Sequence, residues 1–183
     1  MTVNEFNLSE YFRMLEEFRK THEKEIGERF GSCDKFDQLV VEMKAKEAEV
    51  AELALKQYGS LEELSRTTKH NLLQWLKGAR AALDLNQTIQ KTEELMRRVT
   101  ADRSKDVSSE EVQQVVHELV EYSKQSTNGL ELGEHYWSLM GDYYLTNPVY
   151  INSTDQKYGE GASTYIGKAL KAYQSGIIRN PPQ

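Results

Sequence analysis

Tyrosine and tryptophan side chains gather in one stretch of the sequence, residues 130–173. Seven of the ten tyrosines and one of the two tryptophans fall there, separated by glycines and alanines. An aromatic ring with a polar tip can fill a core, or it can contact an apolar ligand and hydrogen-bond the ligand's polar groups. The composition of this stretch therefore leaves two interpretations open, a packed core and a ligand-binding site.

Motifs of catalytic or metal-binding chemistry are missing from the sequence. It has no glycine-rich phosphate loop, no nucleophile elbow and no HExxH motif. The four histidines, His22, His70, His117 and His135, are scattered, and no Glu-x-x-His pair occurs. Cys33, the single cysteine, can form neither an internal disulfide nor a thiolate cluster. We therefore expect no metal, no other cofactor and no enzymatic activity, and an enzyme of unrecognised type is the weakest interpretation.

The overall composition excludes further classes of protein. A net charge of -6 and a pI near 5.4 oppose direct binding of nucleic acid by this chain, because phosphates require lysine and arginine. The mean hydropathy is -0.69, and no apolar run approaches the roughly 20 residues that span a bilayer. The N-terminal residues do not resemble a secretory signal. We expect a cytoplasmic protein without a membrane segment.

Helical patterns cover nearly the whole chain, because the only prolines are Pro148, Pro181 and Pro182. We predict an all-α fold in which residues 1–58 form an N-terminal helical arm of two helices, 8–30 and 34–58. The second helix has only a narrow apolar seam, which would bury little surface. We therefore expect a loosely attached pair of helices that docks on a partner or becomes ordered over a bound ligand. The seam residues are Leu39, Met43, Val50 and Leu53.

Residues 59–178 are predicted to form the ligand-binding domain. Ser60 with Glu63, and Ser108 with Glu111, have the spacing of capping boxes that open helices. A further helix is expected from residue 128 to Asn147, followed by an extended Pro148–Tyr150 and a last helix over 154–177. The glycines of this last helix are predicted to allow close approach of a neighbouring helix or a ligand. They are Gly159, Gly161 and Gly167.

The candidate ligand-binding residues follow from the faces of the helix predicted over 128–147. Trp137, Met140 and Tyr144 share one face, which is the stronger candidate for contact with a ligand. Tyr136 and Tyr143 share the neighbouring face with Leu139, where packing is the stronger interpretation. Two further aromatic residues, predicted to lie opposite these faces, complete the candidate set. They are Tyr158 and Trp75.

Three segments also resemble a known family. They are DVSSEEVQQVV at 106–116, SLMGDYYLTNPVY at 138–150 and DQKYGEGASTYIGKAL at 155–170, with a weaker echo in IGERFGSCDKFD at 26–37. Their order and spacing resemble the TipAS antibiotic-recognition family, effector-binding domains often attached to DNA-binding modules of MerR-type transcription regulators. The resemblance implies a globin-like multi-helix bundle whose cleft captures varied antibiotics, including hydrophobic compounds and thiopeptides.

Two departures from the family pattern refine this expectation. Family members that trap thiopeptides covalently have a cysteine just before the aromatic helix, where this chain reads NGLEL at 128–132. Capture through a thiol bond is therefore not expected, and Cys33 is not a substitute. No helix-turn-helix precedes Met1, so the chain is expected to be a stand-alone drug-binding protein or the effector-binding part of a regulator. DNA would then be contacted only through a fused module.

The alternative function is a helical protein–protein interaction module without a small-molecule ligand. In this interpretation the apolar seam of residues 34–58 docks another protein, which could be a second copy of the chain. The aromatic residues of 130–173 would then serve as core. A thermal-shift response to hydrophobic antibiotics would distinguish the two functions, because only a specific binder is stabilised by its ligand.

Overall fold

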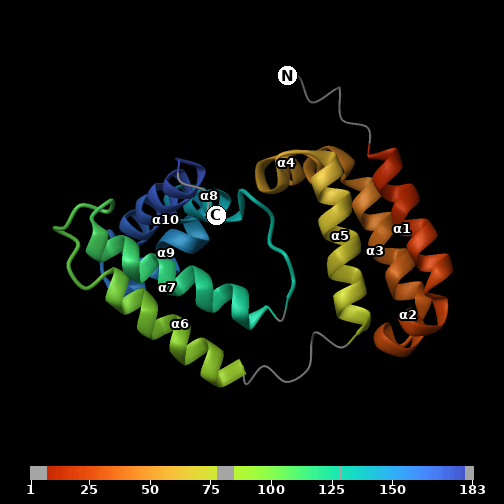
Figure 1. Ribbon diagram of the computed structural model, residues 1–183, viewed down its shortest axis with the longest axis horizontal. Coiled ribbons are helices and arrows are strands. Elements are labelled where there is room, and N and C mark those ends of the chain that lie inside the picture. The colour runs from red at the N-terminus through yellow and green to blue at the C-terminus, as the bar shows by residue number, and fades with distance from the viewer. Residues whose placement is uncertain (1–7, 78–84, 128, 180–183) are drawn as a thin grey trace. The chain divides into compact units, whose positions relative to one another are not determined.

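The computed structural model describes residues 8–77, 85–127 and 129–179, and it confirms the predicted all-α class. Over these ranges the chain forms ten helices and no strand (Figure 1). None of these helices is both long enough and apolar enough to cross a membrane. The helices are α1 Ser9–Thr21, α2 Glu23–Phe30, α3 Cys33–Ala45, α4 Glu47–Tyr58, α5 Leu61–Leu76, α6 Leu85–Val99, α7 Glu110–Ser126, α8 Tyr136–Thr146, α9 Pro148–Tyr158 and α10 Ala162–Arg179.

The chain divides into two compact units. The first comprises residues 1–81 together with the short segment 129–134, and the second comprises residues 82–128 and 135–183. Helices α1–α5 thus belong to the first unit and α6–α10 to the second. The predicted separation of an arm at 1–58 from a ligand-binding domain at 59–178 stays a prediction, as do the loose attachment of the arm and the globin-like arrangement.

The first unit has a hydrophobic core to which each of α1–α5 contributes. Three phenylalanines lie in it, Phe12, Phe18 and Phe36, which are 5%, 5% and 3% exposed. The prediction of two long helices here was wrong, because the chain breaks at His22 and at Lys46, where the backbone leaves helical geometry. The two breaks turn the chain so that short helices can surround one core. Its other buried members are Leu8, Tyr11, Leu15, Ile26, Val40, Ala51, Ala54 and Leu64.

The predicted apolar seam of residues 34–58 is not a continuous surface. Leu39 and Leu53 are 48% and 44% exposed, whereas Met43 and Val50 are half-buried against the core of the first unit. The break at Lys46 also places the two halves of the seam on different helices. This split removes the main observation that favoured a docking module.

The second unit is built around the valine stripe of α7 and the apolar face of α10. Val112, Val116 and Val120 are at most 5% exposed and pack with Ile166 and Leu170, so the predicted stripe is core. The helix begins at Glu110 rather than at Ser108, and no side chain caps it, so the predicted capping box of Ser108 is wrong. By contrast, Ser60 does accept a hydrogen bond from the Glu63 amide at 3.1 Å at the start of α5.

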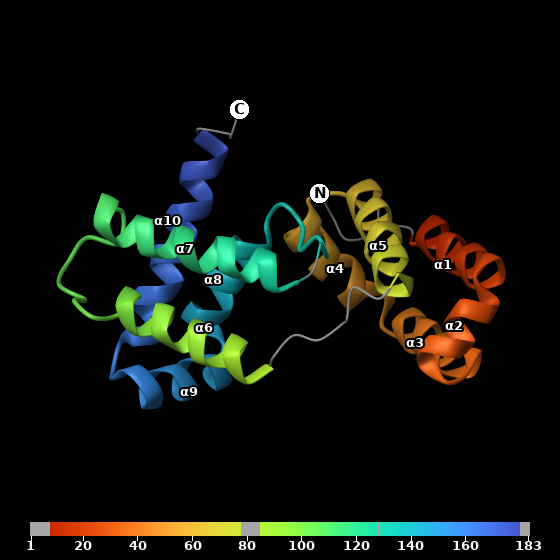
Figure 2. The same cartoon turned by 60° about the horizontal axis from the view of Figure 1, so that its bottom comes forward.

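Helix α10 crosses α8 at very short range, as Figure 2 shows. A Cβ atom added to Gly167 would lie 2.8 Å from the carbonyl oxygen of Gly141, and one added to Gly141 would lie 2.9 Å from that of Gly167. Close helix packing, predicted for all three glycines, thus belongs to Gly167. Gly159 and Gly161 lie outside the helices with φ of 99° and 81°, where residues with a side chain are strained.

Helix α9 occupies the place where an extended segment and the first turns of the last helix were predicted. Pro148 stands in its first turn, where a missing N–H costs nothing, and the side chain of Asn147 accepts a hydrogen bond from Val149 N at 2.9 Å. Asp155 in α9 then accepts hydrogen bonds from the amides of Gly161 and Ser163. These bonds satisfy amides at the start of α10, so α9 and α10 meet at a fixed corner.

Candidate functional site

The aromatic residues of the second unit form a group that we call the tyrosine cluster, comprising Tyr136, Tyr143, Tyr144, Tyr150 and Tyr158. Tyr143 stacks on Tyr150 with ring centroids 5.6 Å apart, and Tyr144 meets the same ring edge-on at 5.4 Å. Tyr136 packs edge-on against Trp137 at 5.0 Å. Helix α8 supplies three of these tyrosines and α9 supplies two.

The two faces of α8 have different surroundings. Trp137, Met140 and Tyr144 are half-buried and pack against the valine core of α7 and α10. Tyr143 on the neighbouring face stacks on Tyr150 of α9, the ring that Tyr144 also meets edge-on. The face favoured from the sequence for ligand contact is therefore the one that rests on the core, and its role in binding stays a prediction.

Burial changes the acidity of the tyrosine hydroxyls. Desolvation raises the pKa of Tyr144 to about 12, and the neighbouring hydroxyls of Tyr150, Tyr158 and Tyr136 add to the effect. The pKa of Tyr136 is raised mainly by burial and secondarily by Tyr150. Among the described residues, none forms a hydrogen bond with the hydroxyl of Tyr136 or Tyr144. At neutral pH these hydroxyls are therefore uncharged donors without a described protein acceptor.

Tyr150 lies at the centre of the cluster, although it was not among the candidates from the sequence. Its ring is the one that both Tyr143 and Tyr144 contact. The sequence prediction of an extended segment at 148–150 gave this residue no helix face and hence no neighbours. The dipeptide Asn147-Pro148 was the available signal, because asparagine before proline is typical of a helix start.

Tyr158 and Trp75, both predicted to lie opposite α8, belong to different compact units. Tyr158 is the last residue of α9; its hydroxyl is close enough to affect the pKa of Tyr144, and Arg103 donates a 3.0 Å hydrogen bond to its carbonyl oxygen. Trp75 lies near the end of α5 and belongs to the first compact unit. The structure thus brings six of the seven candidates into one unit.

Two other tyrosines of the second unit have their hydroxyls committed to the protein. Tyr165 donates to the carbonyl oxygen of Lys105 at 3.1 Å, and the Tyr173 hydroxyl lies 2.7 Å from His117 Nδ1. These bonds fix α10 to α7 and to the loop that precedes it. The hydroxyls of Tyr136 and Tyr144, in contrast, form no such bond with a described residue.

The described part of the chain holds one thiol and no cluster of potential metal ligands. No group of three or more His, Cys, Asp or Glu side chains within it could hold a metal ion. Cys33 is the first residue of α3 in the first unit, where its Sγ donates to the carbonyl oxygen of Glu23 at 3.2 Å. The tyrosine cluster remains as the candidate site, and its chemistry is that of apolar contact and hydrogen bonding.

The described residues thus give an all-α fold with a tyrosine cluster, and a comparison with known families shows the class of protein to which the chain belongs. Residues 50–173, more than half of the chain, match the model of the TipAS antibiotic-recognition domain. The chain therefore belongs to the TipAS family. The match confirms the resemblance and extends it upstream into α4, but the echo at 26–37 lies outside it. No curated protein and no solved structure matches the chain.

Proposed function

We propose that this protein binds peptide-like antibiotics, such as thiopeptides, at the tyrosine cluster, without catalysis and without a covalent bond. Membership of an antibiotic-recognition family supports ligand binding in general. The observation that supports this particular site is the pair of desolvated hydroxyls on Tyr136 and Tyr144. Neither hydroxyl is among the fully buried unpaired atoms of the described residues, so both can be reached from outside, and a ligand carbonyl or ring nitrogen can accept a hydrogen bond from each.

The aromatic rings of the cluster are proposed to supply the apolar part of the binding free energy. Stacked and edge-on aromatic pairs present rigid apolar surface that loses little side-chain entropy when a ligand covers it. Burial of apolar area contributes about 25 cal/mol per Å², before the costs of ordering are subtracted. An apolar, peptide-like compound with several heterocycles fits both the rings and the hydroxyls. The candidate residues Trp137, Met140, Tyr143 and Tyr158 are proposed to shape the same site.

The proposed cellular role is that of an effector-binding part of a transcription regulator, or of a cytoplasmic protein that sequesters the drug. In the first case a fused DNA-binding module would contact the DNA, because the acidic balance of this chain opposes direct contact. Gel-shift assays with the intact gene product would separate the two roles. An antibiotic-dependent shift identifies a regulator, and a protein that binds drug but no DNA is a sequestering protein.

Binding is tested by titrating the protein with a thiopeptide while the tryptophan fluorescence and the melting temperature are recorded. We expect a saturable fluorescence change and a rise in melting temperature, because a ligand that binds only the folded state stabilises it. A hydrophilic aminoglycoside serves as the negative ligand. Absence of both responses at saturating thiopeptide would contradict the proposal.

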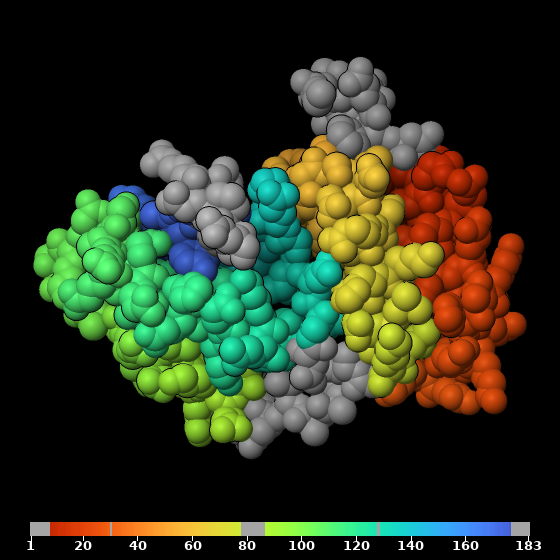
Figure 3. All heavy atoms as spheres, in the orientation of Figure 1, coloured from red at the N-terminus to blue at the C-terminus, as the bar shows by residue number. Residues whose placement is uncertain are grey.

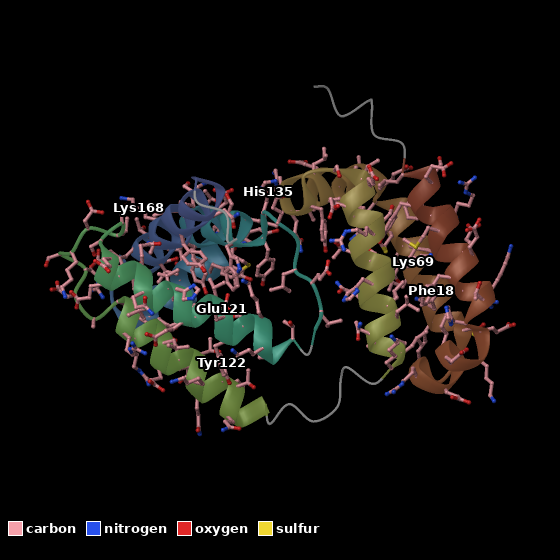
Figure 4. The ribbon with its side chains drawn as sticks, viewed as in Figure 1. Phe18, Lys69, Glu121, Tyr122, His135 and Lys168 are labelled. Carbon is pink, nitrogen blue, oxygen red and sulfur yellow. The ribbon has the colours of Figure 1, made fainter. Side chains whose placement is uncertain are left out.

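Variants of the hydroxyls test the site. Tyr144→Phe keeps the ring and removes the donor, so the thiopeptide Kd should rise about 5- to 10-fold, the value of one hydrogen bond. Tyr122→Phe is the matched control, because Tyr122 is a half-buried tyrosine of α7 outside the cluster (Figure 4). Equal Kd values for the two variants would place the ligand elsewhere.

A further inference from the structure

The segment between α7 and α8 is held on the first unit as if it were a bound peptide. Residues 129–134, which we call the strap, form no helix and lie against α4 and α5 (Figures 1 and 3). In the space-filling view the teal spheres of the strap touch the yellow spheres of α5. The strap is followed by His135, labelled in Figure 4 directly before α8.

Side chains of the first unit bind the main chain of the strap at three points. The Asn71 amide forms two 2.8 Å hydrogen bonds with one residue, accepting from Glu131 N and donating to Glu131 O. Gln57 donates to the carbonyl oxygen of Leu132 at 2.6 Å, and His70 Nε2 lies 3.1 Å from that of Gly129. These contacts bind main-chain groups of a non-helical segment and are independent of the strap's side chains.

A salt bridge adds preference for an acidic side chain. The Arg66 guanidinium lies 2.8 Å from the Glu131 carboxylate and is itself oriented by Glu63 at 3.0 Å. The hydrogen bond from Arg66 holds the pKa of Glu131 below its ordinary value, against the opposing effect of burial. The carboxylate is therefore ionised at neutral pH and paired with a fixed cation.

A glycine is required two residues after the glutamate. Gly133 has φ of 92°, and a Cβ atom built on it would lie 2.8 Å from both the Gln57 carbonyl oxygen and the Tyr58 ring. Real Cβ atoms do not approach other atoms so closely, and the positive φ adds backbone strain. Tyr58 and Gln57 thus select glycine at this position, as Arg66 selects the acid.

We infer that the face formed by Gln57, Tyr58, Arg66, His70 and Asn71 is a recognition site for a non-helical acidic-x-glycine peptide, and that the strap is its exchangeable internal occupant. Exchange is supported because the contacts described above are mostly polar, and because Gly129 and Glu134 at the two ends of the strap are exposed. Segments with few apolar contacts open locally at low free energy. A free peptide with the same pattern can occupy the face while the strap is open.

The test must remove the internal competitor, because a tethered segment has an effective concentration near millimolar. The double variant Glu131→Ala with Gly133→Ala weakens the strap and leaves every residue of the face intact. The probe is the end-capped peptide Gly-Leu-Glu-Leu-Gly-Glu, titrated while NMR follows the side-chain amides of Asn71 and Gln57. We expect saturable shifts of both amides in the double variant and shifts at least about 10-fold weaker in the wild type.

Control peptides and face variants make the result specific. Peptides with glutamine for the first glutamate, or alanine for the second glycine, should bind more weakly than the parent. Adding Asn71→Ala to the double variant should abolish binding, whereas adding Lys69→Ala, on an exposed residue of α5, should leave it unchanged. No saturable shift at millimolar peptide in a folded double variant would overturn the inference, as would equal binding of the alanine peptide.

Hydrogen exchange in the otherwise unaltered chain gives an independent measurement that does not require the double variant to fold. Asn71→Ala should accelerate exchange of the Glu131 amide about 10-fold or more while amides in the middle of α5 keep their rates. Lys69→Ala should change neither. Unchanged exchange at Glu131 in Asn71→Ala would show that the face does not hold the strap, and the inference would fail.

Discussion

The surroundings of the Tyr144 hydroxyl raise its pKa. The hydroxyl lies among three other tyrosines, has no acceptor among the described residues, and has a pKa raised to about 12. Such a group stays neutral in the folded protein over a pH range in which the unfolded chain ionises it. The hydroxyl is thus a neutral hydrogen-bond donor at neutral pH, and its environment destabilises the folded state in strong base.

The raised pKa of Tyr144 is tested by measuring the free energy of unfolding as a function of pH. Because the folded pKa of Tyr144 exceeds the ordinary tyrosine value of 10.0, its contribution to the free energy of unfolding is fully present below pH 10 and is lost as pH rises towards 12. The free energy of unfolding, measured in urea at about pH 9 and about pH 11.5, should fall more in the wild type than in Tyr144→Phe. The difference should be on the order of 1 to 2 kcal/mol.

The outcome that contradicts this prediction is an equal loss in both proteins. It would show that the Tyr144 hydroxyl is solvated in the folded state and ionises normally. Tyr165→Phe is not a suitable control, because the Tyr165 hydroxyl also donates to Lys105 O. Tyr122→Phe removes a hydroxyl of α7 outside the cluster, and it should behave as the wild type.

Among the helices, the crossing of α8 and α10 determines where the tyrosine cluster lies. Gly141 and Gly167 bring the two backbones together, and Ser163 of α10 donates to the Tyr144 carbonyl oxygen at 2.6 Å. The close approach also presses Leu145 against Gly167, where an added Cβ would lie 2.8 Å from Leu145 Cγ. Any side chain at Gly167 would push α8, and with it the cluster, away from α10.

Alanine substitution at two glycines of α10 separates packing from helix propensity. Gly167→Ala should lower the free energy of unfolding by about 1 to 3 kcal/mol, because overpacking at the crossing exceeds the gain in propensity. Gly176→Ala is the matched control, since an added Cβ there meets nothing within 4 Å. It should stabilise the protein by about 0.5 to 1 kcal/mol. Urea unfolding checks both, and a neutral Gly167→Ala would mean that the crossing can relax.

The whole molecule consists of two compact units with separate hydrophobic cores, and the family match extends over parts of both. Residues 50–173 include most of α4, all of α5 and the helices of the second unit up to Tyr173. Helices α1–α3, which contribute Phe12 and Phe36 to the first core, lie outside the match. The candidate site and the strap thus both lie within the matched region, whereas helices α1–α3 precede it.

The cysteine content of the whole chain predicts whether a ligand binds covalently or reversibly. The single cysteine of the chain, Cys33, lies outside the residues that match the family. The segment directly before the aromatic helix α8 contains no cysteine. A thiopeptide should therefore bind reversibly. Intact mass spectrometry after incubation should show the mass of the protein alone, and dialysis should restore the free form. A stable adduct would contradict this, and Cys33→Ser would show whether Cys33 forms it.

Helix type and family were determined by the sequence alone. Periodic apolar residues such as Val112, Val116 and Val120 predict a helix and its buried face, because this pattern depends only on residues a few positions apart. The family resemblance depends likewise on short segments in a fixed order. These features could be predicted without coordinates, and both were confirmed.

The tertiary structure alone decided where the helices break and which rings meet. His22 and Lys46 carry no local stop signal, and the chain turns there because short helices can surround a core that a long helix cannot. Tyr150 reached the centre of the cluster through the corner that Asn147 and Pro148 begin and α9 completes. The strap, too, is held by Asn71, sixty residues away from Glu131 in sequence. Such contacts depend on distances through space, which local periodicity does not determine.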